Sequence, residues 1–197
     1  ELGTGWYTPP GVVHAPGSYL TYEPQWNSDV NSVYENVVEN EIYPYDMLVE
    51  NCPEDKQQDL DYVLSLMDWE KNVDPAYREH YFRPPVLCTQ DENHTENWVA
   101  YGNPYIAAKE LTVNPGCEAV IRDDTPYGCI LVQGHGSLNG QPAETACMLR
   151  FGQMSRDEFF VSYDAASKGV RVRNDSPCEP LVMLKHFPYY PGVPDKA

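Results

Sequence analysis

The feature of this sequence that most restricts its fold is a series of short β-forming segments over residues 98–190. Turn-forming sequences such as Asn114-Pro115-Gly116 and Asn139-Gly140 separate these segments. Short strands at regular spacing, with turn residues between them, are typical of a β-barrel or a β-sandwich. We expect strands at Trp98–Tyr101, Ile106–Val113, Glu118–Ile121, Cys129–Gln133, Ala146–Phe151, Glu158–Tyr163, Gly169–Val172 and Leu181–Phe187.

The composition suits a folded β-rich protein better than a helical bundle. The chain has 197 residues, of which 42% are hydrophobic, with 18 prolines and 15 tyrosines, and this usage favours strands and turns. Its net charge of −17 opposes binding to nucleic acid or to an anionic membrane. No apolar run is long enough for a membrane-spanning helix. We therefore expect no nucleic-acid partner and no membrane association, and a cytoplasmic location in which the six cysteines are free thiols.

Between the β-rich region and the start of the chain, the sequence changes to a helical pattern. Leu60, Val63, Leu64 and Met67 follow the i, i+3, i+4, i+7 spacing of an amphipathic helix. This spacing predicts one helix over Glu54–Asn72.

A segment rich in glycine and proline near the start of the chain frames a single histidine. Gly3, Pro9, Gly11 and His14 have the spacing G-x5-P-x-G-x2-H. Proline and glycine in this order predict a tight turn, followed by a short strand at Val12-Val13 that ends in the histidine. A neutral imidazole is a good ligand for Zn, Fe, Ni or Mn, so His14 is a candidate metal ligand. The alternative is a structural histidine that packs beside the turn.

This spacing resembles the second conserved motif of the cupin superfamily, small antiparallel β-barrels that often hold a metal through that histidine. The later part of the chain is similar to cupins at Val113–Gly116, Ile130–Gly136 and Pro180–Leu184. The resemblance implies a mainly β fold, the double-stranded β-helix or jelly-roll barrel, with one connecting α-helix. It also implies that the chain is the C-terminal portion of a two-barrel protein, a bicupin.

The same resemblance divides the chain into four parts. Residues 1–50 are expected to form the last part of a first barrel, with a strand at Ser18–Glu23, and residues 51–97 a helical connector. Residues 98–190 are expected to form the second barrel and residues 191–197 a tail. An incomplete first barrel would expose sheet edges, which proteins normally cover. We therefore expect a homodimer, or an N-terminal segment that is missing from this sequence.

The second barrel departs from the cupin pattern at its metal positions. The H-x-H positions correspond to Arg122 and Asp124, the glutamate position to Tyr127 or Cys129, and the late histidine to the neighbourhood of Val170. Arginine stays protonated and has no lone pair to offer a metal. We therefore expect the second barrel to be structural, without a typical cupin metal.

The resemblance thus places the working site in the first barrel. His14 would hold a divalent metal ion (Zn, Mn, Fe or Ni) together with ligands from upstream sequence. Glu23 would be the catalytic base, and Trp6, Tyr7 and Tyr22 would form an aromatic wall for a small-molecule ligand such as a sugar.

These assignments imply a metal-dependent sugar or sugar-phosphate isomerase, in which a base moves a proton between carbons. A non-haem iron dioxygenase is one alternative, and it would need open metal positions for oxygen. A non-catalytic binding or assembly module is the other alternative.

The remaining polar candidates in the second barrel are expected to be ordinary surface groups. Asp123 with Asp124, and Asp157 with Glu158, are pairs of adjacent carboxylates. Neighbours on a strand point to opposite faces, so neither pair can converge on one site. His135, between two glycines, is the strongest competing candidate, and we favour an exposed turn histidine there.

Overall fold

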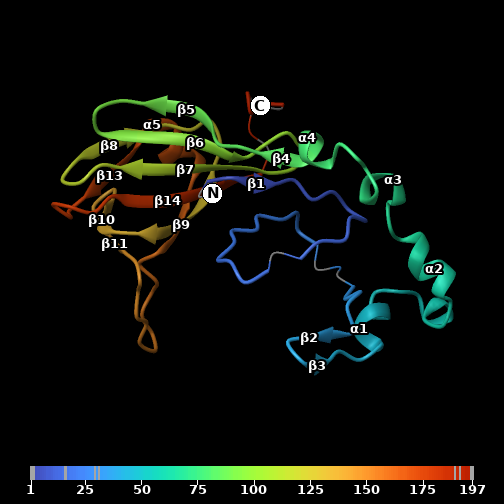
Figure 1. Cartoon of the computed structure of the whole chain (residues 1–197). Coiled ribbons are helices and arrows are strands. Elements are labelled where there is room, and N and C mark those ends of the chain that lie inside the picture. The colour runs from blue at the N-terminus through green and yellow to red at the C-terminus, as the bar shows by residue number, and fades with distance from the viewer. Residues whose placement is uncertain are drawn as a thin grey trace. The chain divides into compact units, whose positions relative to one another are not determined.

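The computed structural model describes residues 3–15, 17–28, 30, 32–188, 190 and 192–195. The chain forms two compact units. One comprises Glu1–Tyr7 and Arg83–Ala197, and we call it the barrel unit; the other comprises Thr8–Phe82, and we call it the helical unit. Figure 1 shows the barrel unit mainly in green to red and the helical unit in blue to green.

Almost all strands of the described chain belong to the barrel unit. Its strands are β1 (Gly5–Trp6), β5 (Val86–Gln90), β6 (His94–Ala100), β7 (Ala107–Val113), β8 (Glu118–Ile121), β9 (Tyr127–Gln133), β10 (His135–Leu138), β11 (Gln141–Glu144), β12 (Glu158–Val161), β13 (Val170–Asn174) and β14 (Leu181–Phe187). The two-residue strand β4 (Phe82–Arg83) spans the boundary between the units.

The order of these strands is that of a jelly roll. One sheet has the order β12-β9-β14-β7-β6-β5 and the other has the order β11-β10-β13-β8. From β7 onward the chain passes repeatedly between the two sheets, so strands that are neighbours in sequence lie in different sheets, except for the hairpin of β10 and β11. This pattern is the double Greek key of a jelly-roll barrel, and the antiparallel pair β5 and β6 extends one sheet at β7. The predicted mainly β, jelly-roll fold is confirmed.

The core of the barrel unit follows from alternation along the central strands. In β14, every second side chain is buried and the residues between them are partly exposed. β7 shows the same alternation from Lys109 to Val113, whereas Ala107 and Ala108 at its start are both buried. The two strands are paired in register from Leu181 opposite Val113 to Phe187 opposite Ala107. Apolar side chains therefore fill the space between the sheets.

The helical unit contains short helices instead of the single helix that we predicted. They are α1 (Asp46–Val49), the 3-10 helix η1 (Glu54–Lys56), α2 (Leu60–Ser65), α3 (Trp69–Asn72) and α4 (Tyr77–Tyr81), with the two-residue strands β2 (Val37–Val38) and β3 (Glu41–Ile42).

The prediction of one helix over Glu54–Asn72 was wrong because aspartates restart the helix twice. The Asp59 side chain accepts a hydrogen bond from the Tyr62 backbone N–H, and the Asp68 side chain accepts one from the Lys71 backbone N–H. An aspartate bonded in this way is an N-cap, which begins a new helix. The apolar residues do have helical spacing, but the N-caps at Asp59 and Asp68 divide the segment into separate short helices.

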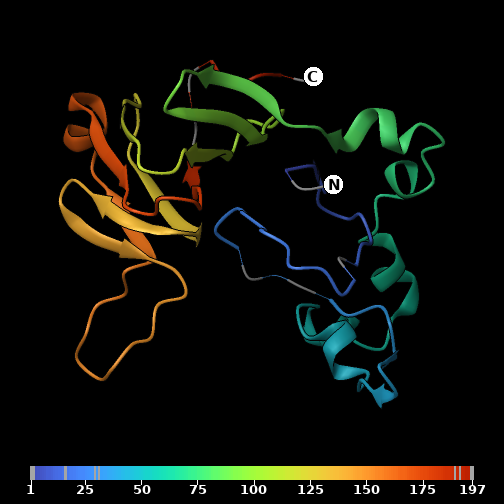
Figure 2. The ribbon, with the colours of Figure 1, turned by 60° about the vertical axis from the view of Figure 1, so that its left-hand side comes forward.

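Several strand predictions also need correction. Ala146–Phe151 is not a strand but part of a loop over residues 145–157, which Figures 1 and 2 show in orange, extending from the sheets. Ser18–Glu23 has no strand in its described residues. The predicted strand Glu158–Tyr163 stops at Val161, because Ser162 caps the helix α5 (Tyr163–Lys168) by accepting a hydrogen bond from a backbone N–H.

Two features of the barrel were not predicted from the sequence. Strand β5 and most of β6 lie in residues 51–97, which we expected to be a helical connector. The hairpin of β10 and β11 was also missed, although the turn between them at Asn139-Gly140 was expected. Both turn residues have positive φ, which asparagine and glycine tolerate.

No helix in the described part of the chain is both long enough and apolar enough to cross a membrane.

Gly136 should be essential to the contact between β10 and β13. A Cβ at this position would lie 1.8 Å from the Arg173 backbone oxygen. We expect Gly136→Ala to lower the free energy of unfolding by about 1–3 kcal/mol, since the strands must separate to admit the methyl group. Gly5→Ala is the matched control, because its Cβ would meet nothing closer than 3.7 Å. Equal denaturation midpoints for the two variants would contradict this prediction.

Candidate functional site in the barrel interior

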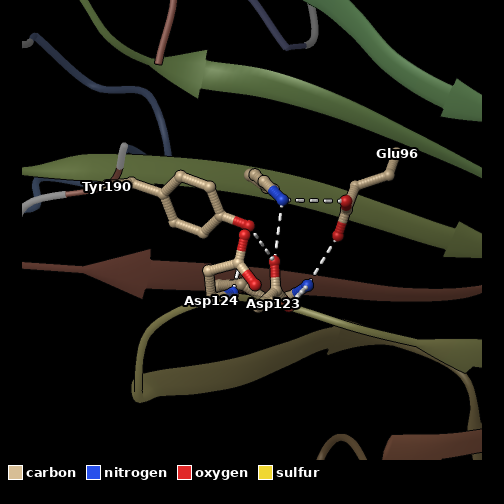
Figure 3. A network of polar contacts seen from close by, with 6 residues as sticks. Glu96, Asp123, Asp124 and Tyr190 are labelled. Carbon is tan, nitrogen blue, oxygen red and sulfur yellow. Dashed lines mark hydrogen bonds and ion pairs between the residues drawn. The ribbon is translucent and has the colours of Figure 1, made fainter. Parts of the chain in front are cut away.

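Four charged side chains lie together inside the barrel, and we call them the buried quartet. They are Glu96 on β6, Lys109 on β7, Asp123 in the turn after β8, and Lys185 on β14. These residues are 2%, 3%, 1% and 0% exposed, respectively. Charged residues are almost never buried to this degree unless they are paired. Figure 3 shows the labelled members Glu96 and Asp123 turned toward the same interior space.

The quartet forms a closed ring of ion pairs. Lys185 Nζ lies 2.6 Å from Glu96 Oε1 and 2.6 Å from Asp123 Oδ2. Lys109 Nζ lies 2.7 Å from Asp123 Oδ1 and 3.2 Å from Glu96 Oε2. Each ammonium group therefore contacts both carboxylates, and the four charges sum to zero.

The strand register makes this ring necessary. Lys185 is directly opposite Lys109 on the paired strands β14 and β7, and like charges in that position repel each other. Burial in a medium of low polarity strengthens the repulsion. Glu96 on the next strand and Asp123 from the other side of the barrel supply the opposite charges that allow both lysines to remain inside.

Aromatic rings surround the two ammonium groups. Lys109 Nζ lies 4.7 Å from the centre of the Trp98 ring and 4.5 Å from that of Tyr190. Lys185 Nζ lies 4.8 Å from the centre of the Tyr127 ring. Cations near aromatic faces are stabilised by the ring quadrupole, and more strongly where water is excluded.

A tyrosine connects the quartet to the surface. The Tyr190 hydroxyl donates to Asp123 Oδ1 at 3.2 Å, as Figure 3 shows, and accepts a hydrogen bond from the Asp124 backbone N–H at 3.4 Å. Tyr190 is half-buried and Asp124 is exposed. The hydroxyl thus gives Asp123 a third donor besides the two lysines.

Two members of the quartet, Lys109 and Asp123, are held in their ionised forms. Burial alone would lower the pKa of Lys109, but Glu96 and Asp123 outweigh it and raise that pKa above its ordinary value. Burial alone would raise the pKa of Asp123, but Lys185 and Lys109 outweigh it and lower that pKa.

The neighbouring acidic groups of the interior are held in their neutral forms. Burial is the main cause that raises the pKa of the Cys129 thiol to about 12, and burial also raises the pKa of the Tyr127 and Tyr190 hydroxyls. Near neutral pH the described interior therefore combines a protonated Lys109, an ionised Asp123, a neutral Cys129 thiol and neutral phenols.

This arrangement is suited to stability rather than to proton transfer or covalent chemistry. A lysine must be neutral to act as a nucleophile, and a base works best with a pKa near the operating pH. The pKa shifts of Lys109 and Asp123 move away from that condition.

The interior also does not fit a bound metal. Every carboxylate oxygen of Glu96 and Asp123 has an ammonium partner, and a divalent cation would have to approach two lysines. Among the residues that the structure describes, no group of three or more histidine, cysteine, aspartate or glutamate side chains is placed to hold a metal ion.

The expectation that Asp123 is a surface residue was wrong. It was paired with Asp124 as a solvated carboxylate, but Asp123 is fully buried and Asp124 is exposed. Arg122, which we aligned with the first ligand position, is exposed as well. Adjacent residues do point in opposite directions, as we argued, and the interior partners of Asp123 come from distant strands instead.

A signal for the quartet was present in the sequence but was not used. Lys109 stands between Ala107 and Leu111, and Lys185 stands between Met183 and Phe187. Each lysine thus occupies a position where strand alternation requires an inward-facing side chain. A charged residue in the apolar phase of a predicted strand indicates a buried ionic partner elsewhere.

The five residues that we predicted as a site in a first barrel lie in two different units. Trp6 and Tyr7 belong to the barrel unit, whereas His14, Tyr22 and Glu23 belong to the helical unit. Glu23 is exposed and accepts a hydrogen bond from a threonine hydroxyl at 3.1 Å. Their roles as catalytic, ligand-binding and metal-ligating residues stay predictions.

The turn before His14 forms as expected. Val12 N–H donates to the Pro9 carbonyl at 3.2 Å, and Gly11 has a φ of 79°. The strand predicted at Val12-Val13 is absent, because the Val13 N–H instead donates to the Asn72 side chain at 2.9 Å. His14 is exposed, and its Nδ1 lies 3.1 Å from the Val12 carbonyl oxygen.

His135, the competing candidate, is the first residue of β10 and is exposed. It therefore lies outside the barrel interior that the quartet occupies.

Comparison with known proteins adds structural likeness only. No protein-family model matches the sequence, and no curated protein matches it. Similar solved structures include a cupin-2 domain protein from Rhodospirillum rubrum, with 14% identity, a TM-score of 0.40, and coverage of 57% of this chain and 76% of that one. An RmlC-like cupin from Shewanella frigidimarina has 13% identity, a TM-score of 0.37, and coverage of 55% and 86%.

A third similar structure is the complex of SigE with the anti-sigma ChrR from Rhodobacter sphaeroides. It has 9% identity and a TM-score of 0.38, and the match covers 51% of this chain and 47% of that chain, so it spans about half the length of that protein. At these identities a likeness concerns the fold alone, and the jelly-roll assignment above depends on the strand order of this chain.

Removing one member of the quartet should strongly destabilise the barrel. We expect Lys185→Met to lower the free energy of unfolding by about 3–5 kcal/mol, because it leaves a buried carboxylate without its cation. Lys185→Met combined with Asp123→Leu should cost less than Lys185→Met alone, since Lys109 and Glu96 remain as a neutral pair. Chemical denaturation provides the measurement.

Lys168→Met is the matched control for that series. Lys168 pairs with Asp164 at 2.8 Å, but both side chains are exposed, and such surface pairs contribute little. Similar losses for Lys168→Met and Lys185→Met would show that burial of the quartet does not matter.

The lowered pKa of Asp123 predicts a specific dependence of stability on pH. An aspartate whose pKa is lower in the folded state contributes stability above its unfolded pKa of about 3.9, and this contribution is lost as the pH falls through the folded value. The difference in unfolding free energy between the wild type and Asp123→Asn should therefore shrink below about pH 4. A difference that stays constant from pH 7 into this range would contradict the assignment of Asp123 as an ionised member of the quartet.

Proposed function

We propose that this chain is a cupin-like binding or assembly module whose barrel interior serves stability rather than catalysis. The observation that carries the proposal is the buried quartet. Its four charges neutralise one another inside the barrel, where every carboxylate oxygen already has a partner.

The packing of the barrel supports this proposal. Side chains that point inward from both sheets are buried, including Leu111, Tyr127 and Met183. A ligand site usually needs a concave space with a few polar groups that are available to the ligand. The polar groups of the quartet are instead satisfied by one another, so the outer surface is the part of the barrel that remains for binding.

A metal-dependent sugar isomerase remains the second candidate, and the geometry of His14 favours it. In the neutral ring, the contact between Nδ1 and the Val12 carbonyl oxygen favours the tautomer with the proton on Nδ1, because that oxygen can only accept a hydrogen bond. Nε2 is then the lone-pair nitrogen, which is the arrangement found in many metal-binding histidines. Glu23 as the base, the divalent metal, and the dioxygenase alternative all remain predictions.

Metal analysis of purified variants tests the two candidates. The wild type, Asp123→Asn and His14→Ala would be loaded with Zn, Mn, Fe(II) or Ni, freed of excess metal and subjected to elemental analysis. The module proposal expects the same metal content in wild type and Asp123→Asn, and no aldose–ketose interconversion in any loaded sample.

Other outcomes would overturn the module proposal. Stoichiometric metal that is lost in Asp123→Asn would show that the barrel interior is a metal site. Metal that is lost only in His14→Ala, together with aldose–ketose interconversion, would establish the isomerase instead.

A further inference from the structure

The most unusual surface of the barrel unit is the loop over residues 145–157, which we call the apolar loop. Met148, Leu149, Phe151 and Met154 are 89%, 54%, 109% and 89% exposed. Figures 1 and 2 show the loop extending away from both sheets. Soluble proteins rarely leave such a concentration of large apolar side chains in water unless another surface covers it.

The base of the apolar loop is firmly held. Glu144 N–H donates to the Arg156 carbonyl at 2.9 Å, and the two side chains form an ion pair at 3.0 Å. Asp157 accepts a hydrogen bond from the Leu131 N–H at 2.7 Å through its backbone oxygen. The loop is therefore presented from a fixed stem, which reduces the entropy that binding must overcome.

The loop also joins two sheet edges. It runs from β11 to β12, and these strands are the last in the order of their respective sheets. Phe160 on β12 is exposed next to it. Edge strands present unpaired backbone groups that can bind another chain, so the loop and the β12 edge form one continuous surface.

We propose that this surface is the interface between two copies of the chain, each inserting its apolar loop against the other. The inference deepens the proposed function and rests on it, since it names the partner of the assembly module. In a two-fold dimer the same patch meets itself, and an apolar patch is complementary to its own copy.

The available area is consistent with a dimer. Phe151 can bury on the order of 150 Å², and the exposed side chains of Met148, Leu149 and Met154 add further apolar area. Stable interfaces bury roughly 800 Å² per partner, and Phe160 with the β12 edge can supply the remainder.

The local charge favours the same occupant. The apolar loop, residues 145–157, contains Arg150, Arg156 and a single acidic residue, Asp157, so its formal charge is +1 in a chain whose net charge is −17. Two such chains repel each other over most of their surfaces. At the apolar loop, with a formal charge of only +1, that repulsion is much weaker than over the acidic remainder of the chain.

The test is the oligomeric state of the full chain, measured by sedimentation velocity over a concentration series. The wild type should be a dimer. The triple variant Met148→Ser, Phe151→Ser, Met154→Ser should be at least about 100-fold weaker in dimerisation, because it removes the centre of the interface. Its thermal stability as a monomer should match the wild type, since these side chains make no core contacts.

Leu87→Ser combined with Val120→Ser is the matched control. Both side chains are exposed and apolar, and they lie on β5 and β8, the opposite edges of the two sheets. The control should dimerise like the wild type. A wild type that stays monomeric, or a dimer that the control disrupts and the loop variant does not, would overturn the proposal.

The dependence of association on salt concentration distinguishes this apolar interface from an ionic one. The outer face of β13 carries Arg171 and Arg173, while Thr8–Phe82 holds 15 of the 30 acidic residues and only 3 of the 13 basic ones. Docking of that face on an acidic unit would weaken as salt rises. An apolar loop interface should strengthen instead, because salt screens the repulsion between the chains.

A photo-crosslinking residue in place of Phe151 identifies the occupant directly. In a mixture of isotope-labelled and unlabelled chains, crosslinks should join the apolar loops of two different chains. Crosslinks only within one chain would show that the loop is covered by its own chain and would overturn the proposal. Metal content does not enter any of these measurements, so this inference and the module proposal can fail separately.

Discussion

The barrel depends on how two lysines can face each other in its interior. The register of β7 and β14 places Lys109 opposite Lys185, and the pair is tolerable only because Glu96 and Asp123 contact both. The desolvation of four charges is costly, and the ring recovers part of that cost through short contacts and aromatic neighbours. The ring connects β6, β7, β14 and the turn after β8 through side-chain contacts.

The same arrangement directs attention to the outside of the barrel. A ligand site usually offers a few polar groups that can bind the ligand. In this barrel the charged groups of the interior are instead paired with one another. What remains is a well-packed scaffold with a long apolar loop on a fixed stem. His14 belongs to the other unit, and its ring geometry is a separate question from the chemistry of the barrel.

Sequence reasoning succeeded where the signal was local. The strands at Ala107–Val113, Glu118–Ile121 and Leu181–Phe187 were predicted to within a residue, because alternation and turn residues define them. The quartet was not predicted, since Glu96 and Lys185 are 89 positions apart and only the fold brings them together. The helix over Glu54–Asn72 failed for the opposite reason, because the local caps at Asp59 and Asp68 outweighed a longer apolar period.

The two lysines that face each other also fix the register of β14 against β7. If β14 slipped by one residue against β7, Lys185 would leave the interior and Leu184 or His186 would enter it. A slip by two residues would keep Lys185 inside but move it away from Lys109 and from the carboxylates that serve both. Apolar side chains of similar size would tolerate such a shift far better. The charged ring therefore makes the observed register of β14 against β7 much more favourable than registers shifted by one or two residues.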